Sequence, residues 1–288
     1  MKKIVILFIG LILLPFCHLS QGKDDGENKI AQRIIALAPH SVELLYAIGA
    51  GDRIVATTEY ADYPKAALKI PRVGNANGIQ IERVIELKPD LVIVWQGGNK
   101  SADIQKLKSL GVNLLSTQPF KISDISKELR QLGKLTGLEQ QANKVIEEVE
   151  KRYKEITNKY KSRSKVKTFY QLWHDPLTSI GPDSWLESLL NDCNAENIFK
   201  DAFSSYPVVS IESVLVKNPQ AIIIPHHSGD NDLQATEKTR IWKKWSEISA
   251  VKNGHVSVIN GDLLHRFTPR VLDGLQTLCE DIDKVRRK

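Results

Sequence analysis

The segment Gly261–Arg270, GDLLHRFTPR, gathers an acid, a histidine and two arginines near the end of the chain. Asp262 and Arg266 stand four residues apart, with His265 between them. Carboxylate, imidazole and guanidinium groups offer the donors and acceptors that hold a polar ligand. The alternative is a local ion pair between Asp262 and Arg266 that only shapes the loop, since exposed pairs are common and contribute little.

Aromatic and polar residues also follow other predicted strands. Apolar, β-branched runs predict strands, with helical patterns such as Ser41–Ile48, Ile81–Leu87 and Asp103–Leu110 between them. This alternation is typical of parallel sheets covered by helices. The predicted strands are Arg33–Ala38, Arg53–Thr58, Asp90–Trp95, Asn113–Thr117, Lys167–Trp173, Ala221–Pro225 and His255–Asn260.

Ligands of open parallel sheets gather outside the carboxyl ends of the strands. Tyr60, Trp95, Trp173 and His174 stand at or just after such ends. The last strand leads into GDLLHRFTPR, where Thr268 is expected to cap a helix that begins at Pro269. Gly261–Phe267 is then a ligand-facing loop.

Two features predict how the elements are grouped. Residues 138–161 contain no Gly or Pro and place apolar residues at helical spacing, which predicts one long helix. Ile81–Val94, IERVIELKPDLVIV, and Ile211–Ile224, IESVLVKNPQAIII, match without a gap, which indicates one helix–turn–strand unit in each half. We therefore expect an α/β fold of two Rossmann-like lobes with parallel-sheet cores, residues 23–137 and 163–288, joined by a helix over 138–162.

The first 22 residues are typical of a secretion signal: Lys2 and Lys3 precede an apolar run that is too short to span a membrane. The signal predicts that the protein is exported to the periplasm. The alternative of a lipid anchor at Cys17 is disfavoured by the bulky Phe16 before it.

The charge of the chain does not favour nucleic acid as a partner. Of the formal charge of +6, +4 remains without the signal, and no basic stripe carries interleaved aromatics.

Cys193 and Cys279 are the other two cysteines of the chain. In an oxidising compartment they predict a disulfide that closes a loop of about 86 residues. The alternative is two separate buried thiols, because a sequence alone does not establish the geometry of pairing.

No catalytic motif is present. The chain has no GxSxG, HExxH or CxxC, so we expect no catalytic residues, no catalytic cofactor and no enzyme. A zinc or manganese site is an alternative, although no pair has the helical spacing HxxxH and the aromatic residues would have little role around a bare ion. The histidines near strand ends are His40, His174, His226, His227 and His265.

Four segments carry a resemblance to a known family: RIIALAPHSVELLYAIGAGDRIVATTEYADYP, IPRVGNANGIQIERVIELKPDLVIVWQGGN, CNAENIFKD and DLLHRFTPR. In this order they resemble the periplasmic cobalamin-binding proteins that deliver the vitamin to an ABC importer. The resemblance implies a monomeric binding protein that carries cobalamin in a cleft between its lobes. Siderophore, haem and metal binders share this layout, and they remain the alternative cargo classes.

The resemblance also implies residue roles. Tyr60 would stack on the corrin ring, and Trp95 and Tyr206 would add aromatic surface. Ala76 stands where the family commonly has a cleft Trp; Trp173 would replace it, and His174 would approach the cobalt unless it is a core or rim residue. The residues expected to hydrogen-bond to the amide-rich rim of the corrinoid are Asp262, Leu263, Leu264, His265 and Arg266.

The repeated unit carries one glutamate per lobe, Glu82 and Glu212. An acid in the first turn of a helix is favoured by the helix dipole and needs no further role. The resemblance implies more: the two glutamates would dock onto arginines of the membrane permease. Equivalent positions on matching lobes suit a two-fold symmetric partner.

Overall fold

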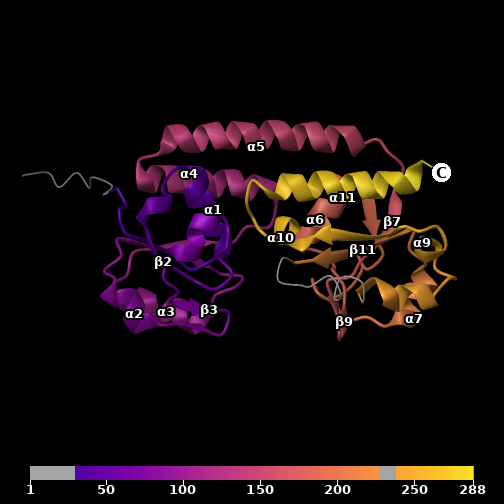
Figure 1. Ribbon diagram of the computed structural model, residues 1–288, viewed down its shortest axis with the longest axis horizontal. Helices are drawn as coiled ribbons and strands as arrows, with labels where there is room; N and C mark the ends of the chain where they lie inside the picture. Colours follow the sequence, from indigo (N-terminus) through magenta and orange to yellow (C-terminus); the bar gives the residue numbers. More distant parts are fainter. Residues whose placement is uncertain (1–29, 228–237, 288) are drawn as a thin grey trace, which may run out of the picture.

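The computed structural model describes residues 30–227 and 238–287. They form two lobes side by side, and one long helix runs across both of them (Figure 1). The predicted signal, including Cys17, lies outside the described residues. Among the described residues, none of the helices combines the length and apolar character that crossing a bilayer requires.

The N-terminal lobe is built on a parallel sheet of four strands in the order β2-β1-β5-β6. Successive residues of β1 face opposite sides: Ile34 belongs to one hydrophobic core and Ile35 to another. Burial on both faces explains why these strands are continuously apolar. The elements are β1 (Ile34–Ala36), α1 (Pro39–Ala47), η1 (Gly51–Arg53), β2 (Ile54–Thr57), η2 (Lys65–Lys69), β3 (Gly74–Asn75), β4 (Gly78–Ile79), α2 (Ile81–Glu86), β5 (Leu91–Trp95), α3 (Ser101–Ser109), β6 (Leu114–Thr117) and α4 (Ile122–Thr136).

The C-terminal lobe has a second parallel sheet, in the order β10-β7-β11-β12. In both lobes the sheet follows the same plan, with the first strand between the second and the third. The elements are β7 (Val166–Tyr170), β8 (Trp173–His174), β9 (Leu177–Thr178), α6 (Trp185–Asp192), β10 (Ala195–Asn197), α7 (Ile211–Lys217), β11 (Ala221–His226), η3 (Ile241–Lys244), α9 (Ser249–Lys252), β12 (Val256–Asn260), α10 (Gly261–Leu264) and α11 (Val271–Arg286).

The predicted repeat is confirmed in detail. Helix α2 leads into β5 in the first lobe, and α7 leads into β11 in the second. Lys88 and Asn218, which occupy the same place in the two copies, are both left-handed, with φ of 45° and 43°. Asp90 and Gln220 also match: the side chain of Asp90 accepts a hydrogen bond from the backbone N–H of Arg33, just before β1, and that of Gln220 accepts one from the backbone N–H of Lys167, within β7.

The long helix α5 spans Glu139–Tyr160 and joins the lobes, as the sequence predicts. Helix α4 lies against it, and between them Gly137 adopts the left-handed conformation, with φ of 67°. Helix α11 also lies beside α5, where Arg152 forms an ion pair of 2.6 Å with Asp273. The fold class is thus confirmed, whereas the lobe limits at 137 and 163 stay predictions.

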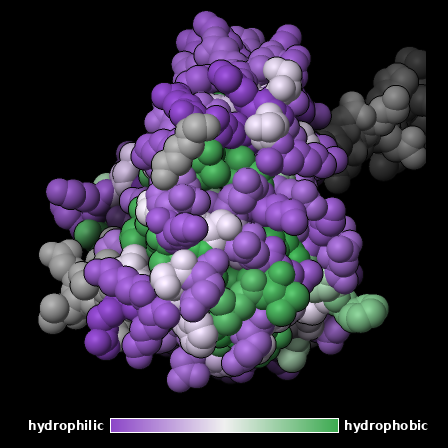
Figure 2. Space-filling view, turned by 90° about the vertical axis from the view of Figure 1, so that its right-hand side faces the viewer, coloured by the Kyte–Doolittle hydropathy of each residue, from purple (hydrophilic) through white to green (hydrophobic). Residues whose placement is uncertain are grey.

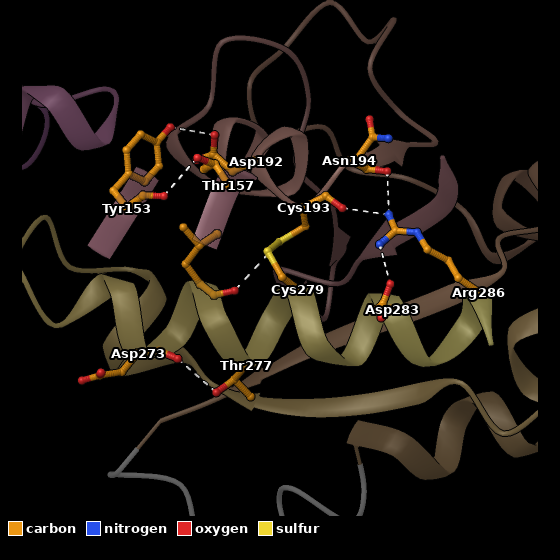
Figure 3. The surroundings of a disulfide bond; sticks show 11 residues. Tyr153, Thr157, Asp192, Cys193, Asn194, Asp273, Thr277, Cys279, Asp283 and Arg286 are labelled. Atoms are coloured by element: carbon orange, nitrogen blue, oxygen red, sulfur yellow. Dashed lines mark hydrogen bonds and ion pairs between the residues drawn. A yellow bond between two sulfur atoms is a disulfide. The ribbon is translucent and has the colours of Figure 1, made fainter. Parts of the chain in front are cut away.

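The predicted disulfide is present between Cys193 and Cys279, whose Cα atoms lie 4.8 Å apart (Figure 3). Cys193 caps the end of α6, and Cys279 lies within α11. Beside the bridge, Arg286 donates to the backbone oxygens of Cys193 and Asn194, at 2.8 and 2.9 Å. The last helix is therefore tied to the body of the C-terminal lobe twice.

Two local predictions are wrong. The strand expected over Lys167–Trp173 ends at Tyr170, and Trp173 instead begins a hairpin of β8 and β9 around Asp175-Pro176. The segment Gly261–Phe267 is not all loop, since it opens with the short helix α10, capped by the side chain of Asn260.

The expected cap at Thr268 is also wrong. Helix α11 begins at Val271, two residues beyond Pro269, and Arg270 is its cap. The Thr268 hydroxyl is buried and has no hydrogen-bond partner within the described residues. A favourable cap sequence therefore does not determine where this helix starts.

Candidate functional site

A cavity of about 730 Å³ lies between the lobes. Its lining comes from the carboxyl ends of strands or the segments that follow them, the expected place for a ligand in this architecture. The volume falls within the range of about 300–1,000 Å³ that is usual for ligand pockets. The lining residues are Pro39, His40, Tyr60, Asp62, Trp95, Trp173, His227, Asp262, His265, Arg266 and Phe267.

The structure brings six of the expected ligand residues together in this lining: Tyr60, Trp95, Trp173, Asp262, His265 and Arg266. The other four lie outside it. Leu264 is wholly buried, and its backbone oxygen accepts from the Trp185 indole. Leu263 packs near Gly274, Tyr206 is half exposed elsewhere on the C-terminal lobe, and His174 is exposed on β8.

Aromatic side chains from both lobes meet beside the cavity. The rings of His40 and Trp95 lie edge to face, 5.5 Å apart, and Phe267 lies 5.4 Å from His40 and 5.7 Å from Trp95. On its other side Phe267 packs against Trp185 at 4.7 Å. Phe267, from the C-terminal lobe, thus contacts His40 and Trp95 of the N-terminal lobe as well as Trp185 of its own lobe.

Charged side chains around the buried Glu43 also join the lobes at this cavity. Arg266 donates to Glu43 at 3.0 Å and to Asp62 at 2.6 Å, and Arg270 donates to Glu43 at 3.1 Å. We call Glu43, Asp62, Arg266 and Arg270 the interlobe ion cluster. The local pair between Asp262 and Arg266 is therefore wrong, because each has another partner.

The cluster holds Arg266 firmly charged. Burial lowers the pKa of Arg266, but hydrogen bonds and attraction from Asp62 and Glu43 outweigh it and hold this pKa above its usual value. The Arg270 guanidinium also lies 3.6 Å from the centre of the Tyr63 ring, a cation–π contact across the lobes.

A second polar group lines the C-terminal side of the cavity. His227 Nδ1 lies 3.0 Å from Asp262 Oδ1, and a hydrogen bond of 2.8 Å joins His265 Nε2 to the Tyr170 hydroxyl. Burial lowers the pKa of His265 to about 3; His227 lowers it further and Asp262 opposes the shift. His265 is thus neutral at physiological pH.

His40 is backed by a buried acid. Its Nε2 lies 3.4 Å from Thr117 Oγ1 and 3.9 Å from Glu128 Oε2. Burial lowers the pKa of His40 to about 3. Burial, and then the nearby charge of Asp124, raises the pKa of Glu128 to about 8. Both members of the pair are therefore neutral at pH 7.

Replacing Glu128 by Gln is expected to raise the free energy of unfolding at pH 7 by about 3 kcal/mol. Folded Glu128 keeps its proton up to about pH 8, whereas the unfolded side chain releases it near its ordinary pKa of 4.5. Its contribution to stability is therefore lost as pH rises between these values, and Gln removes the loss. Urea unfolding at pH 7 measures the gain.

The same unfolding at pH 4 is the internal control. There the acid is largely protonated in both states, so Glu128→Gln should change little. A variant that is less stable than the wild type at both pH values would contradict the assignment of a neutral carboxyl.

Within residues 30–227 and 238–287, no group of three or more His, Cys, Asp or Glu side chains is arranged to hold a metal ion. Sequence reasoning considered His40 and His227 only as metal ligands and missed Pro39, Asp62 and Phe267 as lining residues. The signals were present, since Asp62 lies in the TTEYADYP segment and Phe267 in GDLLHRFTPR.

Comparison with known proteins agrees with this architecture. The model of the periplasmic binding protein family matches residues 34–263. A vitamin B12-binding protein of Vibrio parahaemolyticus is 34% identical over 262 residues, which cover 91% of this chain and 93% of the relative. The solved periplasmic vitamin B12-binding protein of Vibrio cholerae is 36% identical with a TM-score of 0.83, covering 90% of this chain and 99% of that one.

A solved periplasmic haem-binding protein in complex with two haems has a TM-score of 0.77. It covers 88% of this chain and 98% of its own but is only 17% identical, so it shows a shared fold alone. The family is one of solute-binding proteins, not of enzymes. Because its model matches most of the sequence, the chain belongs to the periplasmic binding protein family.

Proposed function

We propose that this protein captures cobalamin or a related corrinoid in the interlobe cavity and delivers it to an ABC importer. The observation that carries the proposal is the similarity to vitamin B12-binding proteins, which extends over about nine tenths of both chains. The cargo is a transported ligand and not a catalytic cofactor. The signal at residues 1–22, or a lipid anchor at Cys17, would place the protein in the periplasm, and we expect it to act as a monomer without binding nucleic acid.

The cavity suits a broad macrocycle. Tyr60 and Trp173 reach it from opposite lobes, and 76% and 54% of their surfaces are exposed. Two accessible flat rings can cover the two faces of a corrin, while the polar lining offers groups for its amide arms. In this proposal Trp173 supplies the aromatic surface that Ala76 lacks.

Tyr60→Ala should weaken the binding of cobalamin by about 1–3 kcal/mol, because the change removes a ring that stacks on the ligand. Titration calorimetry with cyanocobalamin measures the loss. Phe203→Ala is the matched control, because Phe203 is fully exposed and does not line the cavity.

The visible absorbance of protein purified from medium that contains corrinoid, haem and metal salts separates the cargo classes. A corrinoid spectrum supports the proposal. A haem spectrum, or a colourless protein that binds zinc but no cobalamin, would contradict it and favour the alternative cargo classes.

We further propose that Glu82 and Glu212 dock onto arginines of the permease. Both are exposed, each lies in the first turn of its helix, and neither lines the cavity. Helices α2 and α7 occupy the ends of the two lobes that face away from α5 (Figure 1). Hydrogen bonds from its own backbone and from Ser210 lower the pKa of Glu212, so it stays ionised.

The surface around Glu212 supports a contact role. Val216 on the same helix is 87% exposed, and Phe203 is another apolar residue of this lobe that lies fully exposed. Figure 2 shows this lobe end-on: hydrophilic residues cover most of it, and the larger apolar area lies in the half away from α5. Exposed apolar groups beside a charge are typical of an interface.

A further inference from the structure

The turn that follows strand β5 supports one of the aromatic residues that line the cavity. Trp95 ends this strand, and Gly97, Gly98 and Asn99 follow it before helix α3 begins. We call these three residues the 97–99 turn. Glycine and asparagine are typical of turns in general, but here each of the three residues also contacts Trp95.

Both glycines lie against the indole ring of Trp95. A Cβ atom at Gly98 would overlap Cε3 and Cζ3 of this ring, and one at Gly97 would lie 2.9 Å from Nε1 and 3.1 Å from Cε2. Packed carbon atoms prefer separations of about 3.5–4 Å. The backbone can therefore approach the indole this closely only because neither residue has a side chain.

Asn99 holds the backbone of Trp95 through two hydrogen bonds. Its Oδ1 accepts from the Trp95 N–H at 2.8 Å, and its own N–H donates to the Trp95 carbonyl oxygen at 2.8 Å. Its Nδ2 donates to the carbonyl oxygen of Leu37, also at 2.8 Å. Leu37 follows β1, the strand beside β5, and precedes Pro39 and His40, which line the cavity. Asn99 therefore joins the ends of the two strands that lead to this part of the lining.

The turn supports the indole from the side away from the cargo. Trp95 lines the cavity, whereas neither Gly97 nor Gly98 is among the lining residues. The rings of His40 and Phe267 meet the indole at 5.5 and 5.7 Å. A side chain at position 98 would thus displace the indole away from the turn and towards the cavity.

We infer that the 97–99 turn positions the cavity lining for cargo binding by holding the Trp95 indole back from the space that the cargo fills. The inference rests on the proposed function, because the affinity concerned is that for a corrinoid. A ring that is fixed before binding loses no freedom when the macrocycle packs beside it, and this preorganisation favours affinity. The residues of the turn act through Trp95 and need no contact with the cargo.

Calorimetry of the mature protein with cyanocobalamin tests this role in a double-mutant cycle. Gly98→Ala should raise the dissociation constant about tenfold, because the added methyl group displaces the indole. Gly97→Ala should have a smaller effect, since its methyl group would meet the ring less closely. Trp95→Ala should also weaken binding, but adding Gly98→Ala to it should change nothing further, because the displaced atoms are gone.

Fluorine NMR of protein labelled with 6-fluorotryptophan follows the ring without cargo. Trp95→Phe identifies the Trp95 resonance, which Gly98→Ala and Asn99→Ala should both shift. Gly133→Ala is the matched control. A Cβ atom there would lie 2.8 Å from Ala142 Cβ, where α4 packs on α5, so this change should lower stability but leave the Trp95 resonance and the affinity unchanged.

The inference is overturned if the losses from Trp95→Ala and Gly98→Ala add, or if Gly98→Ala leaves either the Trp95 resonance or the affinity unchanged. It is also overturned if Gly133→Ala weakens binding as much as Gly98→Ala does. A wild type that binds no cobalamin contradicts the proposed function instead, and the fluorine resonance then still reports whether the turn holds the ring.

Discussion

Replacing both Cys193 and Cys279 by Ser is expected to lower the free energy of unfolding by about 4 kcal/mol. The disulfide joins residues 86 apart, and in the chain-entropy model a loop of this length restricts the unfolded chain by that amount. Urea unfolding of the oxidised wild type and of the double variant measures the difference.

Reduction provides the matched control. The wild type unfolded in the presence of a reductant should be about as stable as the double variant, whose own stability the reductant should not change. The folded structure should survive in both, because Arg286 still joins α11 to the backbone at Cys193 and Asn194. Equal stability of the oxidised wild type and the double variant would contradict a structural role for the bridge.

The double change Glu82→Ala and Glu212→Ala is expected to weaken association with the importer by about 4 kcal/mol. Removing one partner of an interfacial charge pair usually costs about 2–5 kcal/mol, and here one pair is lost on each lobe. Because neither glutamate lines the cavity, the affinity for cobalamin should stay within a few-fold of the wild type. Binding to the importer in detergent or nanodiscs measures the first quantity, and calorimetry the second.

Glu147→Ala with Glu155→Ala is the control for lost charge. Both of these glutamates are exposed on α5, at the opposite side of the molecule from α2 and α7 (Figure 1). This control should dock like the wild type. If the variant of Glu82 and Glu212 docked normally, or if it lost cobalamin binding instead, the docking proposal would fail.

Much of the fold could be predicted because its signals are local. The strands that carry Ile34 and Ile93 are buried on both faces and therefore appear as uninterrupted apolar runs. The repeat was visible because IERVIELKPDLVIV and IESVLVKNPQAIII match without a gap, and the structure places left-handed turns at the equivalent residues Lys88 and Asn218. Cys193 and Cys279 left a single intramolecular pairing once the first cysteine was assigned to the signal.

The site was predicted only in part because its contacts are distant in sequence. Arg266 and Glu43 are separated by 223 residues, and no periodicity links them. Asp262 and Arg266 suggested a pair because they are close in sequence, yet the packing of the lobes gave each another partner. For the same reason, no local pattern could assign His227 to Asp262, which lies 35 residues away.

The interlobe ion cluster has a consequence for how this protein handles its cargo. Glu43 is 4% exposed, so moving the lobes apart would separate its carboxylate from the guanidinium groups of Arg266 and Arg270 and leave these charges without their partners. Together with α5, these contacts brace the two lobes as a frame, which we expect to change little in shape when cargo arrives. The loaded and empty forms of such a protein would then differ little in the relative position of their lobes. We therefore expect the importer to distinguish loaded from empty protein by the part of the cargo left uncovered at the cavity mouth.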